Sequence, residues 1–193
     1  MTIQLRPLQP SDAPALARLA NNRKIWNHVR DRMPFPYTQQ NAATFIDNIQ
    51  QNERALVRAI LWPDAGFVGT VGLHFCEPPY AGSAELAYWV GEPYWGRGIA
   101  SLAVQEMLAL GFARAELRRV YATVFSFNTG SVRVLERNGF RQEVVARLAI
   151  LKNDQIGDEI TFGLLRTEFG TLQALPDYPH RKHASKTVRD VIG

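Results

Sequence analysis

The stretch ELAYWVGEPYWGRGIAS, residues 85–101, decides the fold of this chain. Residues 84–90 are rich in aromatic and aliphatic side chains and predict a β-strand. Gly96 and Gly98 follow in a turn, and apolar side chains then recur at helical spacing up to Ala115. The chain therefore has a strand that passes through a glycine-rich turn into an amphipathic helix.

Further strands and helices are predicted on both sides of this unit. Before it we expect a strand at 2–8, a first helix capped by Ser11 and Asp12, a helix over 39–51 capped by Thr38, and a hairpin at 55–76. After it we expect a strand at 119–127, a short helix closed by Gly139, and a hairpin of 145–152 with 159–169 around Asn153 and Gly157. The order indicates an α+β fold built around one sheet.

The composition is that of a folded globular protein. Hydrophobic residues make up 46% of the 193 residues and charged residues 21%, which is enough for one substantial core. We expect a single domain at 1–175 and a basic C-terminal tail at 176–193. The net charge of +4 is modest and part of it lies in HRKHASKTVRD, residues 180–190, so a nucleic-acid partner is the weaker interpretation.

The chain carries few signs of export, membrane insertion or metal binding. Cys76 is the only cysteine, the N-terminal MTIQLRPLQP lacks the apolar core of a secretory signal, and no apolar run reaches about 20 residues. These features predict a cytoplasmic protein. His180 and His183 have no cysteine or carboxylate partners at usable spacing, so no metal site is expected.

The glycine-rich turn indicates an anion-binding site. A helix start leaves backbone N–H groups unpaired, and glycines at 96 and 98 let a diphosphate approach them closely, with Arg97 as an additional charge. A dinucleotide fingerprint would need a third glycine at position 101, where this chain has Ser101. A plain helix start without a ligand is the other alternative.

Residues 85–101 and NTGSVRVLERNGF at 128–140 resemble the two core motifs of GNAT acetyltransferases, and residues 84–140 follow the family's order of elements. Gly98 and Ala100 match the family's glycine turn. Trp95 departs from the general pattern but is similar to the Tyr-Trp-Gly-Lys-Gly form of the RimJ/RimL-like branch. The resemblance implies a three-layer α/β/α arrangement around one mixed, mostly antiparallel twisted sheet, splayed at the acetyl-CoA site.

The same resemblance implies where acetyl-CoA binds as co-substrate. A bulge at the end of the central strand would free backbone groups of Tyr88, Trp89 and Val90 for the pantetheine and the carbonyl. Asn128, which is also suited to capping the following helix, would contact the cofactor arm. The turn would hold the diphosphate through Trp95, Gly96, Arg97, Gly98, Ile99, Ala100 and Ser101.

The catalytic groups are assigned by the same comparison. Many family members protonate the departing thiolate with a tyrosine seven residues after the asparagine, but this chain has Leu135 there. Ser131 matches the alternative donor of the RimJ/RimL-like branch, although an ordinary first-turn serine explains it equally well. The branch's carboxylate base falls on Ile150, so Glu85, acting through water, and His74 are the candidates for the base.

The resulting hypothesis is an N-acetyltransferase in which an amine attacks acetyl-CoA directly in a ternary complex. The acceptor is a protein N-terminal α-amine, an amino acid or a small amine. We expect the loop NHVRDRMPFPYTQQ at 27–40 to help form the acceptor pocket, through Met33, Phe35 and Tyr37, together with His74. The alternatives are a catalytically silent acyl-CoA-binding module of the same fold and, less strongly, a nucleic-acid-associated protein. A homodimer stays open.

Overall fold

The computed structural model describes residues 2–174, so the predicted tail lies outside the described residues. The described residues form one seven-stranded sheet in the order β1-β2-β3-β4-β5-β7-β6. Only β4 and β5 pair in parallel, and every other neighbouring pair is antiparallel. The strands are β1 Gln4–Pro7, β2 Ala55–Trp62, β3 Gly66–Phe75, β4 Ser83–Val90, β5 Arg119–Phe125, β6 Arg141–Lys152 and β7 Gln155–Leu165.

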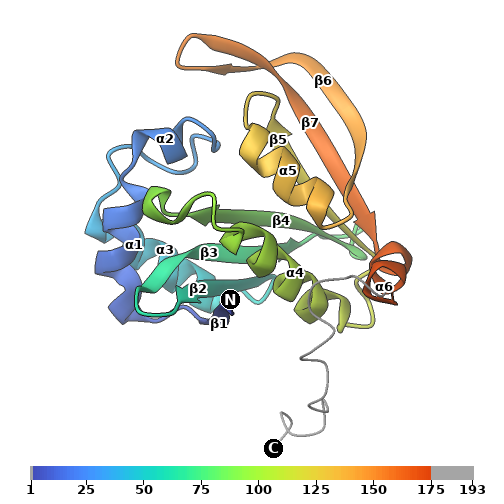
Figure 1. The fold of residues 1–193 in the computed structure, drawn as a ribbon, viewed down its shortest axis with the longest axis horizontal. Helices are drawn as coiled ribbons and strands as arrows, with labels where there is room; N and C mark the ends of the chain where they lie inside the picture. Colours follow the sequence, from blue (N-terminus) through green and yellow to red (C-terminus); the bar gives the residue numbers. More distant parts are fainter. Residues whose placement is uncertain (1, 175–193) are drawn as a thin grey trace, which may run out of the picture.

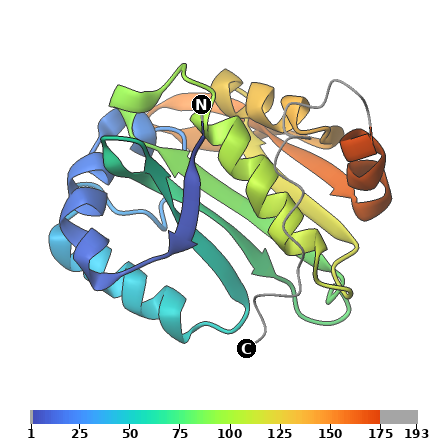
Figure 2. The same ribbon diagram turned by 60° about the horizontal axis from the view of Figure 1, so that its bottom comes forward.

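Helices cover both faces of this sheet (Figure 1 and Figure 2). The helices are α1 Ala13–Ala20, α2 Arg23–Trp26, α3 Gln39–Gln51, α4 Ile99–Phe112, α5 Thr129–Arg137 and α6 Arg166–Ala174. One core packs α1 and α3 against β2 and β3 through residues such as Leu16, Ile46 and Val57. The other packs α4 and α5 against β3, β4 and β5, with Met107 and Leu135 among its members. The expected α+β architecture with three layers is confirmed.

The sheet splits between β4 and β5. Their parallel pairing covers only three residues on each strand, from Ser83 opposite Arg119 to Glu85 opposite Tyr121. Beyond that point β5 stays paired with β7 as far as Phe125, while β4 stays paired with β3 as far as Val90. Backbone groups on the facing edges of β4 and β5 are therefore released from sheet pairing.

The splay replaces the bulge expected at the end of the central strand. The register between β3 and β4 runs without a shift from Phe75 opposite Ala84 to Gly69 opposite Val90. The prediction of a bulge at 88–90 is therefore corrected. The backbone groups are freed because the neighbouring strand leaves, so β4 needs no extra residue.

Two expectations about the last hairpin also change. The last hairpin turns at Asn153 and Asp154, which both have positive φ, whereas Gly157 lies inside β7. Its second strand stops at Leu165, where the side chain of Glu168 accepts a hydrogen bond from the Leu165 backbone N–H (2.9 Å) and α6 begins.

The predicted cap at Thr38 is confirmed, since its Oγ1 accepts from the Asn41 N–H at 3.2 Å.

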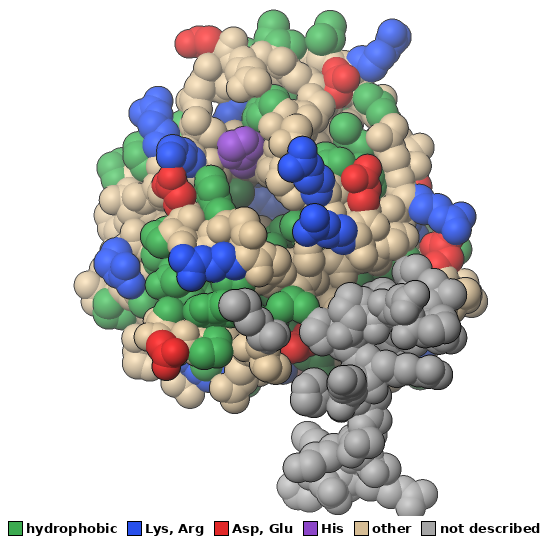
Figure 3. Space-filling view, viewed as in Figure 1, with side chains coloured by type: hydrophobic (Ala, Val, Ile, Leu, Met, Phe, Trp, Pro, Cys, Tyr) green, Lys and Arg blue, Asp and Glu red, His purple; other side chains and the backbone are tan. Residues whose placement is uncertain are grey.

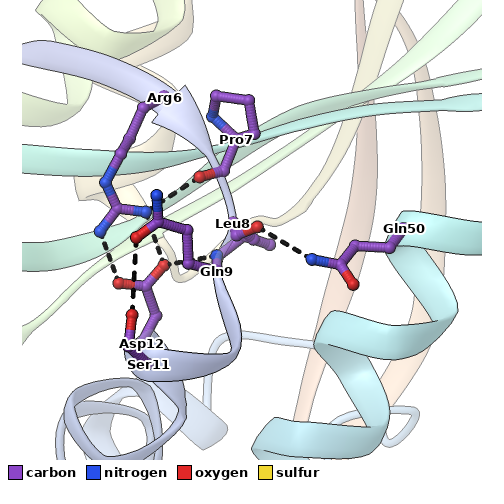
Figure 4. Close-up of polar contacts among 7 residues, drawn as sticks. All are labelled: Arg6, Pro7, Leu8, Gln9, Ser11, Asp12 and Gln50. Carbon is purple, nitrogen blue, oxygen red and sulfur yellow. Dashed lines mark hydrogen bonds and ion pairs between the residues drawn. The ribbon is translucent and has the colours of Figure 1, made fainter.

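Asp12 is the N-cap residue of α1, as predicted, but its side chain makes no capping hydrogen bond to that helix (Figure 4). Its buried carboxylate accepts two hydrogen bonds from the Arg6 guanidinium, at 2.6 and 2.7 Å, and one from the Gln9 backbone N–H at 2.8 Å. Burial raises the pKa of this carboxyl, but the hydrogen bonds outweigh burial and leave the pKa below its ordinary value. Gln50 on α3 donates to the Leu8 carbonyl at 3.1 Å. These contacts fix the passage from β1 into α1.

Gly69 allows β3 to approach the end of β4, so we predict that Gly69→Ala destabilises the protein. A Cβ at this position would overlap the carbonyl oxygen of Trp89 and approach the Cα of Val90 at 2.9 Å. Backbone atoms cannot move aside as a flexible side chain can, so we expect a loss of about 2 kcal/mol in the free energy of unfolding. Urea denaturation measures it.

The matched control is Gly170→Ala in α6, where a Cβ meets nothing within 4 Å. Alanine favours helix over glycine, so this variant should be neutral or slightly more stable. Equal stability of the Gly69→Ala and wild-type proteins would contradict the role given to Gly69.

Candidate functional site

The gap between β4 and β5 opens into a cleft of about 920 Å³. Its walls are residues 86–90 of β4, residues 122–125 of β5, the starts of α4 and α5, and the loop that follows α2. In Figure 3, Lys and Arg side chains lie on both sides of the hollow between α2 and α5. The charged lining residues are Lys24, Arg30, Arg32, Arg133 and Arg137, against Glu85 alone. The electrostatics of the cleft therefore favour an anionic ligand.

The glycine-rich turn forms one end of this cleft. Gly96 and Gly98 have φ values of 74° and 75°, and a Cβ on either would meet nothing within 4 Å. Gly98 is the N-cap of α4 and provides no side chain to satisfy the first N–H groups of the helix. These N–H groups stand beside open space at the positive end of a 14-residue helix. This is an arrangement that binds phosphate groups.

Ten of the eleven residues predicted to contact the cofactor line the cleft: Tyr88, Trp89, Val90, Trp95, Gly96, Gly98, Ile99, Ala100, Ser101 and Asn128. The eleventh, Arg97, does not line it. Its guanidinium carbon lies 5.9 Å from the ring centroid of Tyr94 instead. The Trp95 indole N–H donates to the Val90 carbonyl at 2.6 Å, which attaches the turn to the end of β4.

Ser131 is held at the start of α5 and reaches β4. Asn128 caps this helix by accepting a hydrogen bond from the Ser131 N–H at 3.1 Å. The Ser131 Oγ lies 2.7 Å from the Tyr88 hydroxyl, and both residues line the cleft. Leu135, one turn further along α5, is fully buried in the core. The cleft wall therefore presents two hydroxyl groups, one from α5 and one from β4.

The opposite face of the sheet carries the titratable groups. Glu85 lies directly across from His74 in the β3–β4 pairing, so the two side chains share a face. Strand alternation places Glu85 on the other face from Tyr88. Burial lowers the pKa of His74 below its ordinary value, and the nearby Arg32 also lowers it, although Glu85 acts in the opposite direction.

Arg30 joins this cluster from the loop after α2. Its guanidinium contacts Glu85 at 3.3 Å, Glu159 at 3.3 Å and the Thr123 hydroxyl at 2.6 Å. It thereby bridges β4, β5 and β7 across the place where the sheet splits. Arg30 is shared between the two carboxylates, and Arg32, which lines the cleft near His74, is a second cation on this side.

The loop at 27–40 contributes to the cleft through other residues than those predicted. Tyr37 is buried in the core beneath α1 and α3, Met33 packs against the same core, and Phe35 stacks on Trp26 with 5.5 Å between ring centroids. None of these three lines the cleft. The apolar side chains anchor the loop, and the polar neighbours His28, Arg30 and Arg32 face the cleft. Of the residues predicted for the acceptor pocket, only His74 lines the cleft.

The tip of the β6–β7 hairpin fastens this loop in place. Lys152 is buried, forms an ion pair with Asp31 and lies 3.7 Å from the Trp26 ring centroid. Asn153 donates a hydrogen bond to the Asn27 side-chain oxygen at 2.7 Å. The contacts join segments more than 120 positions apart and attach the loop that carries His28, Arg30 and Arg32 to the hairpin.

Sequence reasoning missed six charged residues in or beside the cleft: Lys24, Arg30, Arg32, Arg133, Arg137 and Glu159. Arg133 and Arg137 both line the cleft from α5, and their spacing of four residues on one helix face was a usable signal. Arg30 and Glu159 come together only because β7 pairs with β5 beside the loop. Nothing in their local sequence indicates that contact.

Comparison with known proteins agrees with this geometry. A family profile described as "Acetyltransferase (GNAT) domain" matches residues 2–141. The chain belongs to the GNAT acetyltransferase family. It is therefore an acetyl-CoA-dependent N-acyltransferase, and the glycine turn, the free N–H groups and the basic lining fit acetyl-CoA as its co-substrate.

Individual relatives support the RimJ/RimL-like assignment. The N-acetyltransferase p20 of Bacillus licheniformis is 33% identical over 53% of this chain, a match that spans 57% of that protein. The putative ribosomal N-acetyltransferase YdaF of Bacillus subtilis is 29% identical over 86% of this chain and 93% of its own length. The structure of Mycobacterium smegmatis RimJ in complex with a CoA-disulfide has a TM-score of 0.75 at 25% identity, covering 86% of this chain and 83% of that one.

Two features are absent from the part of the chain that the structure describes. None of the helices within 2–174 has the length and apolar character needed to cross a membrane. In the same part of the chain, histidine, cysteine and carboxylate side chains do not gather into a group of three that could hold a metal ion.

We predict that a charge at the glycine turn weakens binding of coenzyme A, and a matched pair of substitutions isolates the charge. Asparagine and aspartate both tolerate the left-handed backbone that Gly98 adopts and have almost the same size. Gly98→Asp should bind coenzyme A at least about tenfold more weakly than Gly98→Asn, because only aspartate repels the phosphates. Calorimetric titration measures both. Equal affinities would move the phosphate site away from this turn.

Proposed function

We propose that the protein acetylates primary amines, with a preference for α-amino groups, by direct attack of the amine on acetyl-CoA in a ternary complex. The observation that carries this proposal is the cleft itself, which passes between β4 and β5 and borders both faces of the sheet. The anion-binding turn and Ser131 lie toward one face, while Glu85 and His74 lie on the other. Donor and acceptor then meet at the split without competing for the same surface.

On the donor face, α4 and α5 supply the groups that hold coenzyme A. The N–H groups after Gly98 would bind the diphosphate, and Arg133 and Arg137 add positive charge beside the cleft. The free edge of β4 at 88–90 would hydrogen-bond the pantetheine arm. Ser131 would donate the proton that the departing thiolate needs.

On the acceptor face, the Glu85 carboxylate lines the cleft and would accept a hydrogen bond from the incoming amine. The amine must lose its proton before it attacks. His74 suits this task because its lowered pKa keeps the ring neutral at pH 7, and no hydrogen bond to that ring is found among the described residues. Glu85 faces it across the strand pair and would orient it or act through water.

The preference for α-amines rests on the same weak base. An α-amino group has a pKa of about 8 and a lysine amine a pKa of about 10.4, so the first requires far less help to become neutral. The relative YdaF carries the name of a putative ribosomal N-acetyltransferase, which agrees with a protein N-terminus as acceptor. An amino acid or a small amine of low pKa fits the same chemistry.

We also propose that residues 1–175 act as one catalytic domain and that the protein works in the cytoplasm. The described part of the chain forms one continuous sheet with two packed cores, which supports the first statement. The single cysteine at position 76 supports the second.

The acceptor preference is tested with two peptides of the same sequence. One has a free N-terminus and no lysine, and the other has a blocked N-terminus and one lysine. At pH 7 we expect kcat/KM to be at least about tenfold higher for the free α-amine, because a larger fraction of it is neutral. Acetyl-CoA consumption measures both reactions.

Equal rates on the two peptides would contradict the preference for α-amines, and a faster reaction at lysine would reverse it.

The same peptides, used with His74→Gln and Glu85→Gln, identify the base. In the wild-type protein, kcat/KM should rise with pH on the acid side of the profile as the base loses its proton. The variant that lacks the base should not show this rise.

Ser131→Ala tests the proton donor. Removing a general acid should lower kcat by about 100-fold and leave the affinity for coenzyme A nearly unchanged. Ser131→Thr keeps a hydroxyl at the same position and is the matched control, so it should retain more activity than the alanine variant. Full activity of Ser131→Ala would return this residue to a purely structural role.

A further inference from the structure

The phenol of Tyr88 contacts the serine that the proposed mechanism uses as acid. Tyr88 lies on β4 and Ser131 on α5, and their side chains meet across the cleft with 2.7 Å between the two hydroxyl oxygens. The Tyr88 hydroxyl oxygen lies farther, 3.2 Å, from the Ser131 carbonyl oxygen, and the phenol has only one proton to donate. Ser131 is thus approached by two groups, Asn128 at its backbone N–H and Tyr88 at its side chain.

We infer that Tyr88 is the positioning residue for Ser131: its O–H donates to the Ser131 Oγ, so that the Ser131 proton points into the cleft toward the sulfur of coenzyme A. This inference rests on the proposed role of Ser131. It adds a side-chain role to a residue whose backbone alone was expected to contact the cofactor.

The environment of Tyr88 keeps the phenol in the donor form. Burial raises the pKa of Tyr88 far above its ordinary value of 10. The phenol therefore stays protonated throughout the pH range in which an amine acetyltransferase works. A group that keeps its proton serves as a fixed hydrogen-bond donor, and it is poorly suited to be the acid that gives the proton away.

A serine hydroxyl needs such a partner for geometric reasons. Its hydrogen rotates freely about the Cβ–Oγ bond and otherwise finds the nearest acceptor, which at the start of a helix is often a backbone carbonyl. Donation from Tyr88 occupies one lone pair of Oγ, and the serine proton must then point elsewhere. Both partners sit on rigid elements, since β4 is paired with β3 along its length and α5 is capped by Asn128.

Tyr88 supplies a hydroxyl group that α5 does not provide at position 135. Residue 135 of α5 is leucine, and its side chain is fully buried in the core. The phenol is instead delivered from β4, on the same cleft wall as Ser131. The fold therefore brings a tyrosine to the donor from another element, 43 positions away in the sequence.

The proton balance of the step is simple. The amine nitrogen bonds to the thioester carbon, the carbon–sulfur bond breaks, and its electron pair stays on sulfur. The Ser131 O–H bond breaks as the S–H bond forms, and Oγ regains a proton from water in the cleft, into which the product nitrogen releases its own. Tyr88 keeps its proton and stabilises the transient negative charge on Oγ.

Tyr88→Phe tests the inference, because it removes the hydroxyl and keeps the ring that packs against the core. We expect kcat to fall about tenfold, with coenzyme A affinity by calorimetry almost unchanged, since only a hydrogen bond to the acid is lost. In a Ser131→Ala background the same substitution should have no further effect on kcat, because the group through which it acts is absent.

Tyr121→Phe is the matched control. Tyr121 on β5 is also half-buried and has a hydroxyl partner, the Cys76 thiol at 3.8 Å, but it does not line the cleft. This variant should keep wild-type kcat and KM. Comparison of the two tyrosine variants separates the loss of a hydroxyl in general from the loss of this one.

Three results would overturn the inference. They are an unchanged kcat in Tyr88→Phe, a loss of coenzyme A affinity that accounts for the whole effect, or an equal further loss of kcat in the Ser131→Ala background. If Ser131→Ala alone is fully active, the proton-donor assignment fails and the role of Tyr88 fails with it. If Ser131→Ala is slow and Tyr88→Phe is normal, only the role of Tyr88 is lost.

Discussion

The separation of β4 from β5 is the constraint on which the rest of the structure depends. A parallel pair must be joined by a crossover, here α4, and the pair is held for only three residues before the strands part. Each strand then keeps its other neighbour, β3 for β4 and β7 for β5, so the sheet opens without unfolding. The cost is a set of backbone groups without sheet partners, and a ligand that lies in the gap can satisfy them.

The gap also explains how one cleft offers two kinds of chemistry. Side chains of a strand alternate between faces, so neighbouring positions on β4 serve opposite sides of the sheet. Tyr88 meets Ser131 on the side of α4 and α5, and Glu85 meets His74 and Arg30 on the other side. In a closed sheet these groups would be separated by backbone. Where the strands part, both sets border the same space.

The side of the cleft that carries Glu85 is held in place by distant parts of the chain. The loop after α2 is held by two sets of contacts. The apolar side chains of Met33 and Tyr37 pack against the core, and Lys152 and Asn153 of the β6–β7 hairpin contact Asp31 and Asn27. Lys152 is almost fully buried, so its charge requires the Asp31 carboxylate and the Trp26 ring as partners. These two attachments hold the segment that presents Arg30 to Glu85 and Glu159.

The sequence by itself determined that a strand, a glycine turn and a helix follow one another here, although α4 ends at Phe112 and not at the predicted Ala115. The positive φ at Gly96 and Gly98 and the helical spacing of apolar residues are local properties. For the same reason it located the glycine-rich turn at the start of α4, the Asn128 cap and the hairpin of β2 and β3. Only the tertiary structure decided that β4 opens by losing a neighbour, that Arg97 turns to Tyr94, and that the aromatic side chains of the 27–40 loop pack inward. The contacts of Tyr88 with Ser131 and of Arg30 with Glu159 join residues 43 and 129 positions apart. Such pairs depend on strand order and register, which local spacing does not encode.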